Sequence, residues 1–226
     1  MRKFLKNIKK LINKLLGTFG DELYWRFRHV FADPKWAENY ISENSISHAH
    51  RQFLIDRIAA YAPIENILEI GCASGPNLYL LKKRFPNIKT FGIDISKYAV
   101  RVGQKWFNNE KITDFKFSEG KADDLKEFSD KSIDIIFTDA MLIYIGPEKI
   151  RKVIKEIMRV ARKAVILNER HDNSTFCSYK DHWIYNYEAL LSDFVNEEKI
   201  MITKIPEGLW PVEGWKEFGA VIEAVL

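Results

Sequence analysis

Residues 67–77 of the chain read ILEIGCASGPN, and this stretch decides the fold. Its first four residues are apolar except for Glu69, a pattern typical of a buried parallel strand with an acid near its carboxyl end. Gly71 and Gly75 bracket a tight turn, because a missing side chain permits a positive φ and lets a ligand approach the backbone. Pro76 suits the first position of a helix. The stretch therefore predicts a strand, a glycine turn with exposed backbone N–H groups, and a helix.

Apolar segments and helical segments alternate after this turn. The pattern predicts strands at residues 67–70, 88–94, 115–118, 132–139 and 164–167, and helices that begin at residue 76 or span residues 96–107, 147–161 and 187–195. Two closing strands are expected at residues 200–205 and 217–225, joined by a loop at residues 206–214. This alternation predicts a mostly parallel α/β sheet of seven strands with helices on both faces and an antiparallel hairpin at one edge.

Length and composition bound the class of protein. A chain of 226 residues, 46% of them hydrophobic, suits one sizeable domain plus an appendage. No run of about 18 apolar residues occurs, so no membrane-spanning helix is expected, and the N-terminus shows no secretory signal. Cys72 and Cys177 are the only cysteines, which argues against a disulfide framework or a metal cluster and fits a reducing cytoplasm.

The charge is distributed unevenly along the chain. The net charge is +4, yet residues 1–20 hold six basic residues and no acid. The other 206 residues therefore carry a net charge of −2. A mildly acidic body argues against a broad nucleic-acid surface.

Residues 1–20 have the pattern of a basic amphipathic helix. At about 100° per residue, the apolar positions fall within an arc of roughly 140°, opposite the basic ones. These apolar positions are Phe4, Leu5, Ile8, Leu11, Ile12, Leu15 and Leu16. Such a helix lies on an anionic membrane surface in one interpretation. In the other, it packs its apolar stripe on the domain or on a second subunit and leaves the lysines in water.

Residues 21–62 are expected to form a helical cap. Helices are predicted at residues 22–31, just after Pro34, and at residues 45–61. The first two of these helices are rich in aromatic residues. In one interpretation the aromatic side chains are core. In the other, the segment covers the mouth of a ligand site and Arg51 faces a carboxylate.

Four acids lie at the carboxyl ends of predicted strands. Glu69, Asp94, Asp139 and Glu169 follow the first, second, fourth and fifth strands. In an open α/β sheet, ligands bind outside these strand ends. Asp94 lies 23 residues after Gly71, the spacing at which an acid on the second strand reaches a ribose hydroxyl pair. The glycine turn and Asp94 together predict a site for an adenosyl ligand.

The order of four motifs resembles a known family. ILEIGCASGPN, GIDIS, KADDL and SIDIIFTDAMLIYI follow one another as in class I S-adenosylmethionine-dependent methyltransferases, over about residues 63–170. The resemblance implies a Rossmann-like, three-layer α/β/α domain over residues 63–226 with S-adenosyl-L-methionine as cofactor. It implies that Glu69 and the turn contact the methionine end, that Asp94 holds the ribose and that Ile95 packs on the adenine. With Arg51 of the cap, the expected cofactor-binding residues are Glu69, Gly71, Cys72, Ala73, Gly75, Asn77, Asp94, Ile95, Ala122, Asp123, Asp139 and Arg51.

Two positions depart from the family pattern. Ala73 stands where the family often has glycine, which narrows the turn but keeps its backbone donors. Lys121 stands where the family often has an acid that meets the adenine amino group, just before an alanine. Ala122 still offers its backbone N–H. The acids near enough in sequence to replace the missing one are Glu119, Asp123 and Asp124.

The acceptor is expected to be a small molecule or a glycan precursor. Residues 139–194 are similar to methyltransferases found with surface-glycan and modified-sugar biosynthesis. Methylation of exocyclic base amines commonly uses an N/D-P-P-Y/F motif after the fourth strand, whereas this chain has TDAM. The resemblance therefore implies a saccharide or small-molecule partner and no nucleic acid. A cytoplasmic location, peripheral membrane contact and a homodimer are further expectations.

Methyl transfer from a sulfonium is an in-line displacement, so positioning supplies much of the catalysis. An oxygen acceptor also benefits from a base with a pKa near the working pH. His171, just after the fifth strand, and Asp139 are the predicted catalytic residues. The weaker candidates for the base are His182, His48 and His50. Trp183, Tyr185 and Tyr187 are expected either in an acceptor pocket or in the core.

Two other classes of protein remain as alternatives. A nicotinamide-dependent oxidoreductase is disfavoured, because Ala73 and Leu78 break its G-x-G-x-x-G spacing. The other alternative is a non-catalytic module with a methyltransferase fold, held at a membrane surface by its first helix. Binding of the cofactor and its demethylated product discriminates these alternatives. The sequence predicts no metal site.

Overall fold

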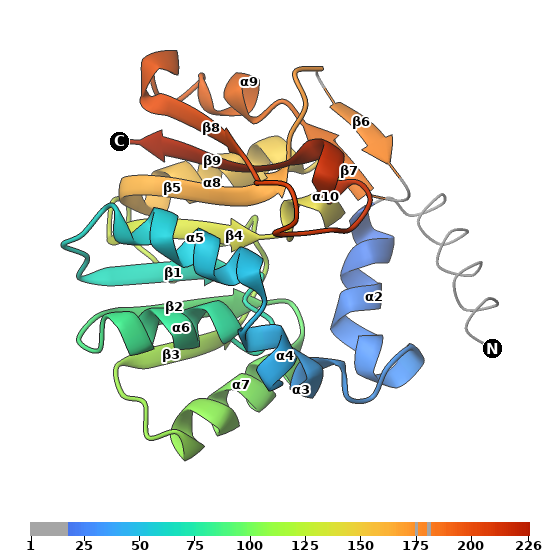
Figure 1. Cartoon of the computed structure of the whole chain (residues 1–226), viewed down its shortest axis with the longest axis vertical. Helices are drawn as coiled ribbons and strands as arrows, with labels where there is room; N and C mark the ends of the chain where they lie inside the picture. The colour runs from blue at the N-terminus through green and yellow to red at the C-terminus, as the bar shows by residue number, and fades with distance from the viewer. Residues whose placement is uncertain (1–17, 175, 180–181) are drawn as a thin grey trace.

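The computed structural model of the protein describes residues 18–174, 176–179 and 182–226. Its centre is a seven-stranded sheet in the order β3-β2-β1-β4-β5-β9-β8 (Figure 1). The strands of this sheet are β1 (Asn66–Ile70), β2 (Lys89–Asp94), β3 (Phe115–Glu119), β4 (Ile133–Asp139), β5 (Ala161–Arg170), β8 (Ile200–Lys204) and β9 (Gly219–Val225). The first five are parallel, and β9 is antiparallel to both β5 and β8. The predicted mostly parallel sheet with an antiparallel closing hairpin is therefore confirmed.

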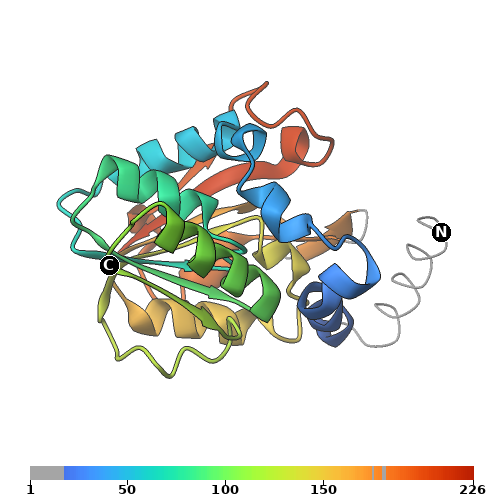
Figure 2. The same cartoon turned by 90° about the horizontal axis from the view of Figure 1, so that it is seen from below.

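Helices cover both faces of the sheet, which Figure 2 shows from a second direction. One face carries α5 (Ala49–Ala59), α6 (Pro76–Arg84) and α7 (Lys97–Asn109). The other carries α8 (Ile150–Val160) and α9 (Tyr187–Leu191). The shorter elements are α3 (Trp36–Tyr40), α4 (Glu43–Ile46), α10 (Trp215–Phe218) and the 3₁₀ turns η1 (Leu142–Tyr144) and η2 (Glu197–Lys199).

Each face of the sheet buries its own hydrophobic core. In β1, Leu68 and Ile70 point to the core beneath α8, whereas Ile67 points to the core beneath α5 to α7. Successive side chains of a strand point to opposite faces, so a strand covered on both sides must be apolar at nearly every position. This requirement explains the nearly continuous apolar run of the central strands.

Helix α2 (Thr18–Phe31) lies beyond the carboxyl ends of the parallel strands (Figure 1). It contacts α3 and α7 and belongs to the predicted helical cap. The predicted amphipathic helix at residues 1–20 falls mainly on residues 1–17, which lie outside the described part of the chain. Among the described residues, no helix is long and apolar enough to cross a membrane.

Three elements differ from the sequence-based prediction. The helix expected at residues 45–61 is two helices, because the His48 ring accepts a hydrogen bond from the His50 N–H and caps a new helix at Ala49. β5 continues to Arg170, because it pairs along its length with β9. An additional hairpin of β6 (Phe176–Tyr179) and β7 (His182–Tyr185) follows β5, where only a loop was expected. The first difference arises from a local helix cap, and the other two arise from strand pairing that hydrophobic periodicity does not register.

Candidate functional site

A cavity of about 420 Å³ opens at the carboxyl ends of the parallel strands. Its volume lies in the range typical of small-molecule sites. Eight of the predicted cofactor residues line it: Arg51, Gly71, Ala73, Asp94, Ile95, Ala122, Asp123 and Asp139. Residues far apart in sequence therefore meet where the topology of an α/β sheet places a ligand.

The turn after β1 forms one wall of this cavity. Gly71 has a φ of 77° and Gly75 a φ of 83°, both in the left-handed region that favours glycine. A Cβ at Gly71 would collide with the side chain of Met141, and one at Gly75 would meet the Phe117 ring at 2.6 Å. Ala73 also has a positive φ, of 48°. The absent side chains thus let Met141 and Phe117 pack directly against the turn.

Asp94 is fixed at the cavity wall by two backbone donors. The Ala73 N–H donates to one carboxylate oxygen and the Ser96 N–H to the other, each at 2.8 Å. Burial raises the pKa of Asp94 to about 6, although these two N–H groups oppose the rise. Each oxygen keeps a second acceptor position. The carboxylate can therefore receive hydroxyl groups from a ligand without a change of rotamer.

Asp139, at the end of β4, collects donors from four residues. Its Oδ2 accepts from Asn77 at 2.9 Å and from Arg51 at 3.2 Å, and it lies 3.3 Å from His50 Nε2. Its Oδ1 accepts from Asn168 at 2.8 Å. Burial alone would raise the pKa of Asp139, but His50, Arg51 and Asn77 hold it well below its usual value. Asp139 is therefore an anion that anchors its neighbours, and a poor proton acceptor.

Four predicted cofactor residues lie behind the cavity wall rather than on it. Glu69, Cys72, Gly75 and Asn77 are not among the lining residues. Asn77 donates at 2.7 Å to Glu69, and its side-chain oxygen accepts from Arg51 at 2.7 Å. Burial raises the pKa of Glu69 well above its usual value. Glu69 and Asn77 thus position Arg51 and Asp139 from behind the cavity wall.

His171, the first candidate for the base, makes its contacts away from the cavity. This residue does not line the cavity. Its Nδ1 accepts from the Tyr187 N–H at 3.3 Å, and its own N–H donates to the Phe218 carbonyl at 2.8 Å. Burial lowers the pKa of His171. The ring therefore joins the end of β5 to α9, which is a structural task that spacing along the sequence does not reveal.

His50 lines the cavity in place of His171. It is buried, with Nε2 next to Asp139 and Nδ1 2.6 Å from Nδ1 of His48. Its ring stacks on Trp210 with centroids 4.0 Å apart. His182, another weaker candidate, also lines the cavity. His50 adjoins Arg51, predicted to face the ligand mouth, and this adjacency is the sequence signal that points to it.

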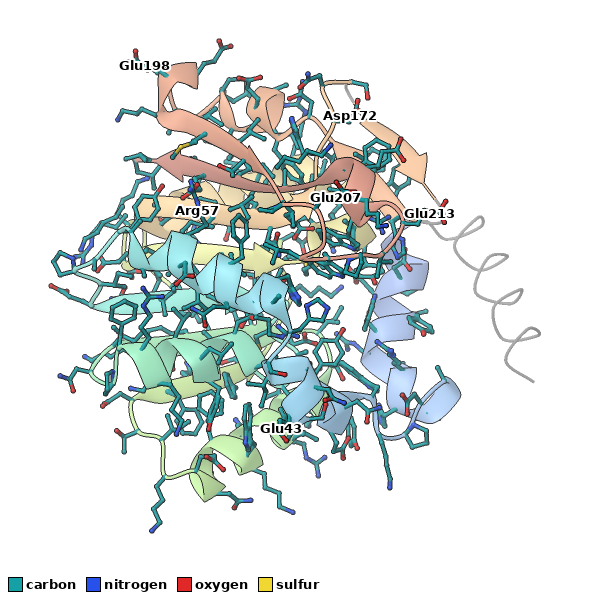
Figure 3. The ribbon with its side chains drawn as sticks, in the orientation of Figure 1. Glu43, Arg57, Asp172, Glu198, Glu207 and Glu213 are labelled. Carbon is teal, nitrogen blue, oxygen red and sulfur yellow. The ribbon has the colours of Figure 1, made fainter. Side chains whose placement is uncertain are left out.

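Aromatic rings line part of the cavity. They come from the helical cap, η1, the loop after β8 and the start of α10: Trp25, Trp36, Tyr40, Tyr144, Trp210 and Trp215. Trp210 and Trp215 stack with centroids 3.8 Å apart. Glu207 and Glu213 mark the two ends of the loop that carries Trp210 (Figure 3). The cap, this loop and α10 therefore give the cavity an aromatic wall.

The aromatic residues predicted after β5 lie elsewhere. Tyr185 and Tyr187 are buried in the core beneath α8, and Tyr185 donates to the Ile145 carbonyl at 2.6 Å. Trp183 packs against the same core. None of the three lines the cavity. Of the two interpretations of these residues, core packing is the one that matches their positions.

Lys121 is paired with an acid that the sequence did not suggest. Its Nζ donates to Glu22 of α2 at 2.6 Å, and Glu22 also pairs with Lys149. Asp123 is held by Lys149 and Lys152, each at 3.0 Å. Glu22, Lys121, Asp123 and Lys149 all line the cavity. An acid from α2 therefore stands beside Lys121, where the family pattern places an acid from the loop after β3.

Glu169, the fourth strand-end acid, stabilises the fold. One of its oxygens accepts from the Thr138 hydroxyl at 2.7 Å and from the N–H groups of Met141 and Leu142 at 3.0 Å. Burial raises the pKa of Glu169 to about 7, although these three donors oppose the rise. The carboxyl thereby holds the turn between β4 and η1, which carries Asp139 to the cavity.

The residues present fit the cofactor that the motifs imply. The Asp94 carboxylate has open acceptor positions, and the oppositely charged Arg51 and Asp139 line the same cavity. Such a pair suits the carboxylate and ammonium groups of an amino acid. Met141 approaches the Gly71 backbone so closely that a side chain there would obstruct the turn. Within the described residues, no cluster of three or more His, Cys, Asp or Glu side chains is arranged to hold a metal ion.

Comparison with known families agrees with this geometry. A family model described as a methyltransferase domain matches residues 67–164. An uncharacterized protein of Rickettsia prowazekii (strain Madrid E) is 27% identical over 100 residues, or 43% of this chain and 40% of that protein. The match thus spans less than half the length of that relative.

Solved structures share the fold over most of the chain. A geranyl diphosphate C-methyltransferase from Streptomyces coelicolor A3(2), solved with geranyl-S-thiolodiphosphate and S-adenosyl-L-homocysteine, has a TM-score of 0.64 at 13% identity. The comparison covers 84% of this chain and 80% of that one. A SAM-dependent methyltransferase from Aquifex aeolicus has a TM-score of 0.61 at 14% identity, covering 85% of this chain and 98% of that one. At these identities the likeness concerns the fold.

The matched domain, the sheet order and the residues that line the cavity agree with the family that the four motifs resemble. The cofactor of that family is S-adenosyl-L-methionine. Residues 67–164 therefore match a methyltransferase domain, and the chain has the fold of the solved S-adenosylmethionine-dependent methyltransferases.

Proposed function

We propose that this chain transfers the methyl group of S-adenosylmethionine to a small molecule held in the aromatic half of the cavity. The observation that carries the proposal is the continuity of one cavity from Asp94 to the Trp210–Trp215 stack. A methyltransferase must hold the donor and the acceptor in one water-poor space with the reacting atoms in line. A cavity with one polar end and one aromatic end meets that need.

The bound cofactor supplies an electrophilic methyl group on a positively charged sulfur. Asp94 would accept hydrogen bonds from the ribose, and Arg51 and Asp139 would hold the charged groups of the methionine end. The rings of Tyr40 and Tyr144 also line the cavity. Aromatic faces attract cations, so they favour the charged sulfonium over water at this point.

For an oxygen acceptor, we propose His50 as the residue that takes up the proton. Asp139 is ionised and accepts from Nε2, so Nδ1 is the basic nitrogen of the His50 ring. That atom lies 2.6 Å from Nδ1 of His48, and a proton gained there is shared between the two rings. Burial, the charge that His50 acquires with the proton and the charge of Arg51 lower the pKa of His48, which keeps His48 neutral and able to accept.

The proposed acceptor is a small molecule with a flat or apolar surface, and a saccharide precursor remains in this class. Aromatic rings stack on planar molecules and on the C–H faces of sugars. The solved relatives from Streptomyces coelicolor act on geranyl diphosphate, an apolar chain with a charged head. The aromatic half of the present cavity supports an acceptor with at least one apolar face.

Asp94→Ala provides the direct test. Isothermal titration calorimetry of the wild-type chain with S-adenosylmethionine and S-adenosylhomocysteine should show binding of both. The variant should lose this binding, because the alanine offers no acceptor to the ribose. Asp130→Ala, which removes an exposed acid outside the cavity, is the matched control and should bind like the wild type.

A non-catalytic binding module remains the alternative function. It predicts cofactor binding without methyl transfer to any acceptor in a screen with radiolabelled S-adenosylmethionine. A wild-type chain that binds neither the cofactor nor its demethylated product would refute both functions.

We also propose a cytoplasmic location, membrane contact through residues 1–20 and a homodimer. The division of the chain into residues 1–20, 21–62 and 63–226 is a further proposal.

A further inference from the structure

We infer that the methyl acceptor carries a carboxylate or phosphate group, and that Arg170, the last residue of β5, binds this group. Arg170 lines the cavity and is only 4% exposed. A guanidinium keeps its positive charge at any physiological pH, and its planar fork matches the oxygens of a carboxylate or phosphate. The inference rests on the proposed function, because it takes the aromatic part of the cavity as the place of the acceptor.

Two side chains hold the guanidinium of Arg170 at the cavity wall. Its central carbon lies 5.4 Å from the centre of the Trp215 ring, and Nη1 lies 3.4 Å from Nδ1 of His182. Trp215 and His182 also line the cavity. A guanidinium has five N–H donors, so Arg170 can contact His182 and an anionic ligand at the same time. Stacking on the indole ring orients the fork before a ligand arrives.

A row of stacked rings connects Arg170 to the proposed base. The His50 ring stacks on Trp210 with centroids 4.0 Å apart, and Trp210 stacks on Trp215 at 3.8 Å. Arg170 lies over the same Trp215 ring, and all four residues line the cavity. A flat acceptor that lies along this row would present its reacting atom to His50 and its anionic end to Arg170. Two contacts at a fixed spacing would thus orient the acceptor for methyl transfer.

A second guanidinium adds positive charge to this part of the cavity. Burial and the nearby Tyr40 raise the pKa of Tyr144, a lining residue, whereas the charges of Arg28 and Arg170 oppose the rise. The carboxylate of Asp21 also acts on the Tyr144 hydroxyl, in the opposite sense to the two guanidinium groups. The balance of these three charges is positive, which favours an anion beside Tyr144.

Other occupants fit Arg170 less well. The methionine carboxylate is the anionic group of the cofactor, and the proposed function gives it Arg51 as its partner. The contacts of Arg170 with Trp215 and His182 lie outside the residues proposed to bind the cofactor. A cationic acceptor would be attracted by the aromatic rings, but the charges of Arg170 and Arg28 would repel it.

Calorimetric titration with simple probes tests the inference on the full chain saturated with S-adenosylhomocysteine. Benzoate and phenyl phosphate carry the two anionic groups, benzamide is a neutral analogue of benzoate, and benzylamine is a cation. At least one of the two anions should bind about tenfold more tightly than benzamide, because hydrogen bonds between charged partners are the stronger ones. The anion that binds more tightly distinguishes a carboxylate site from a phosphate site. Benzylamine should bind more weakly than benzamide.

Variants of Arg170 assign the preference for an anion to this side chain. Arg170→Gln should abolish the preference and leave the affinity for S-adenosylhomocysteine unchanged. Arg170→Lys keeps the charge but not the planar fork, so it should retain only part of the preference. This second variant carries the test if circular dichroism shows that Arg170→Gln does not fold. Arg151→Gln removes an exposed guanidinium outside the cavity, and this matched control should bind every probe like the wild type.

Several outcomes would overturn the inference. One is a wild type that binds neither anion more tightly than benzamide, and another is a wild type that prefers benzylamine. A folded Arg170→Gln or Arg170→Lys variant with the full preference for the anion would also overturn it. Loss of S-adenosylhomocysteine binding in folded Arg170→Gln would instead make Arg170 a cofactor residue. A wild type that does not bind S-adenosylhomocysteine refutes the proposed function, whereas one that binds it without preferring an anion refutes this inference alone.

Discussion

At the scale of single residues, the cavity separates side chains that face the ligand from those that hold them in place. Asp94, Arg51 and His50 line the cavity, whereas Glu69, Asn77 and His171 do not. Both groups contain the residue types that catalysis uses. The difference is made by packing, which places each side chain either on the cavity wall or behind it.

The assignment of the base to His50 instead of His171 leads to a kinetic prediction. His50→Gln should lower kcat for a hydroxyl acceptor by about 10²–10⁴, because the base that takes the proton is lost. The KM for S-adenosylmethionine should change little. His171→Gln should leave kcat unchanged and lower only the melting temperature, because its ring joins β5 to α9. Steady-state kinetics of both variants would reject this assignment if the effects were reversed.

The titration of Asp94 leads to a prediction about pH. Its pKa is raised to about 6, mainly by burial, and only the ionised carboxylate can accept hydrogen bonds at both oxygens. Affinity for S-adenosylhomocysteine should therefore fall as the pH drops below about 6, by up to tenfold per pH unit. Calorimetry across this range checks it. The His50→Gln variant should keep this pH dependence of the affinity, and the Asp94→Asn variant should lose it. A wild-type affinity for S-adenosylhomocysteine that does not change with pH would contradict the prediction.

The effect of Asp94 on the stability of the ligand-free protein has the opposite sign. A carboxyl whose pKa is higher in the folded state stabilises the fold when it is protonated. This contribution is fully present below the ordinary value of about 3.8 and is lost as the pH rises through about 6. The site thus keeps a charged carboxylate at neutral pH at some expense of stability.

At the scale of elements, α2 closes one side of the cavity. Its inner face carries Glu22 to the loop after β3, and its outer face is apolar and exposed. Burial alone would raise the pKa of Glu22, but Lys121 and Lys149 hold it below its usual value. The ion pairs therefore stabilise α2 in place above the ordinary pKa of about 4.5 and weaken as the pH falls through the lowered one.

Glu22→Gln should loosen α2. A partly buried ion pair of this kind contributes about 1–2 kcal/mol, so amide hydrogen exchange in α2 should accelerate by about tenfold. Affinity for the cofactor should fall with it, because Glu22 lines the cavity. Glu119→Gln is the matched control: it removes the exposed partner of Arg26 on the same helix, 3.8 Å away, and should change neither quantity. Equal exchange rates in the two variants would argue against the role given to Glu22.

At the scale of the whole molecule, two cores on either side of one sheet hold the strand ends in register. Phe137 of β4 is fully buried beneath α5 to α7, two residues before Asp139. The packing of Phe137 therefore helps to position the site. A shift of β4 would move the Asp139 carboxylate, which orients Arg51 and His50.

Phe137→Ala should destabilise the fold by about 3–5 kcal/mol, through lost burial and the cavity left behind. Chemical denaturation measures this change. Phe194→Ala, which truncates an exposed ring, should alter the free energy of unfolding by only about 0.5 kcal/mol. Similar losses in the two variants would show that the core on this face contributes less than its burial indicates.

Much of this molecule was predictable from local patterns in the chain. Period-two and period-3.6 hydrophobicity predicted the parallel strands and their helices, and the spacing of Gly71 and Asp94 predicted an adenosyl site at the strand ends. These features depend on neighbours within a few residues or on the simple rule that parallel strands end at one edge. The tertiary structure alone decided which aromatic rings wall the cavity, that Glu22 meets Lys121, and that His50 rather than His171 lies beside Asp139. Those outcomes depend on how segments tens of residues apart pack together and on which hydrogen-bond donors they bring to one another. The local hydrophobic periodicity of a single sequence does not reveal such contacts.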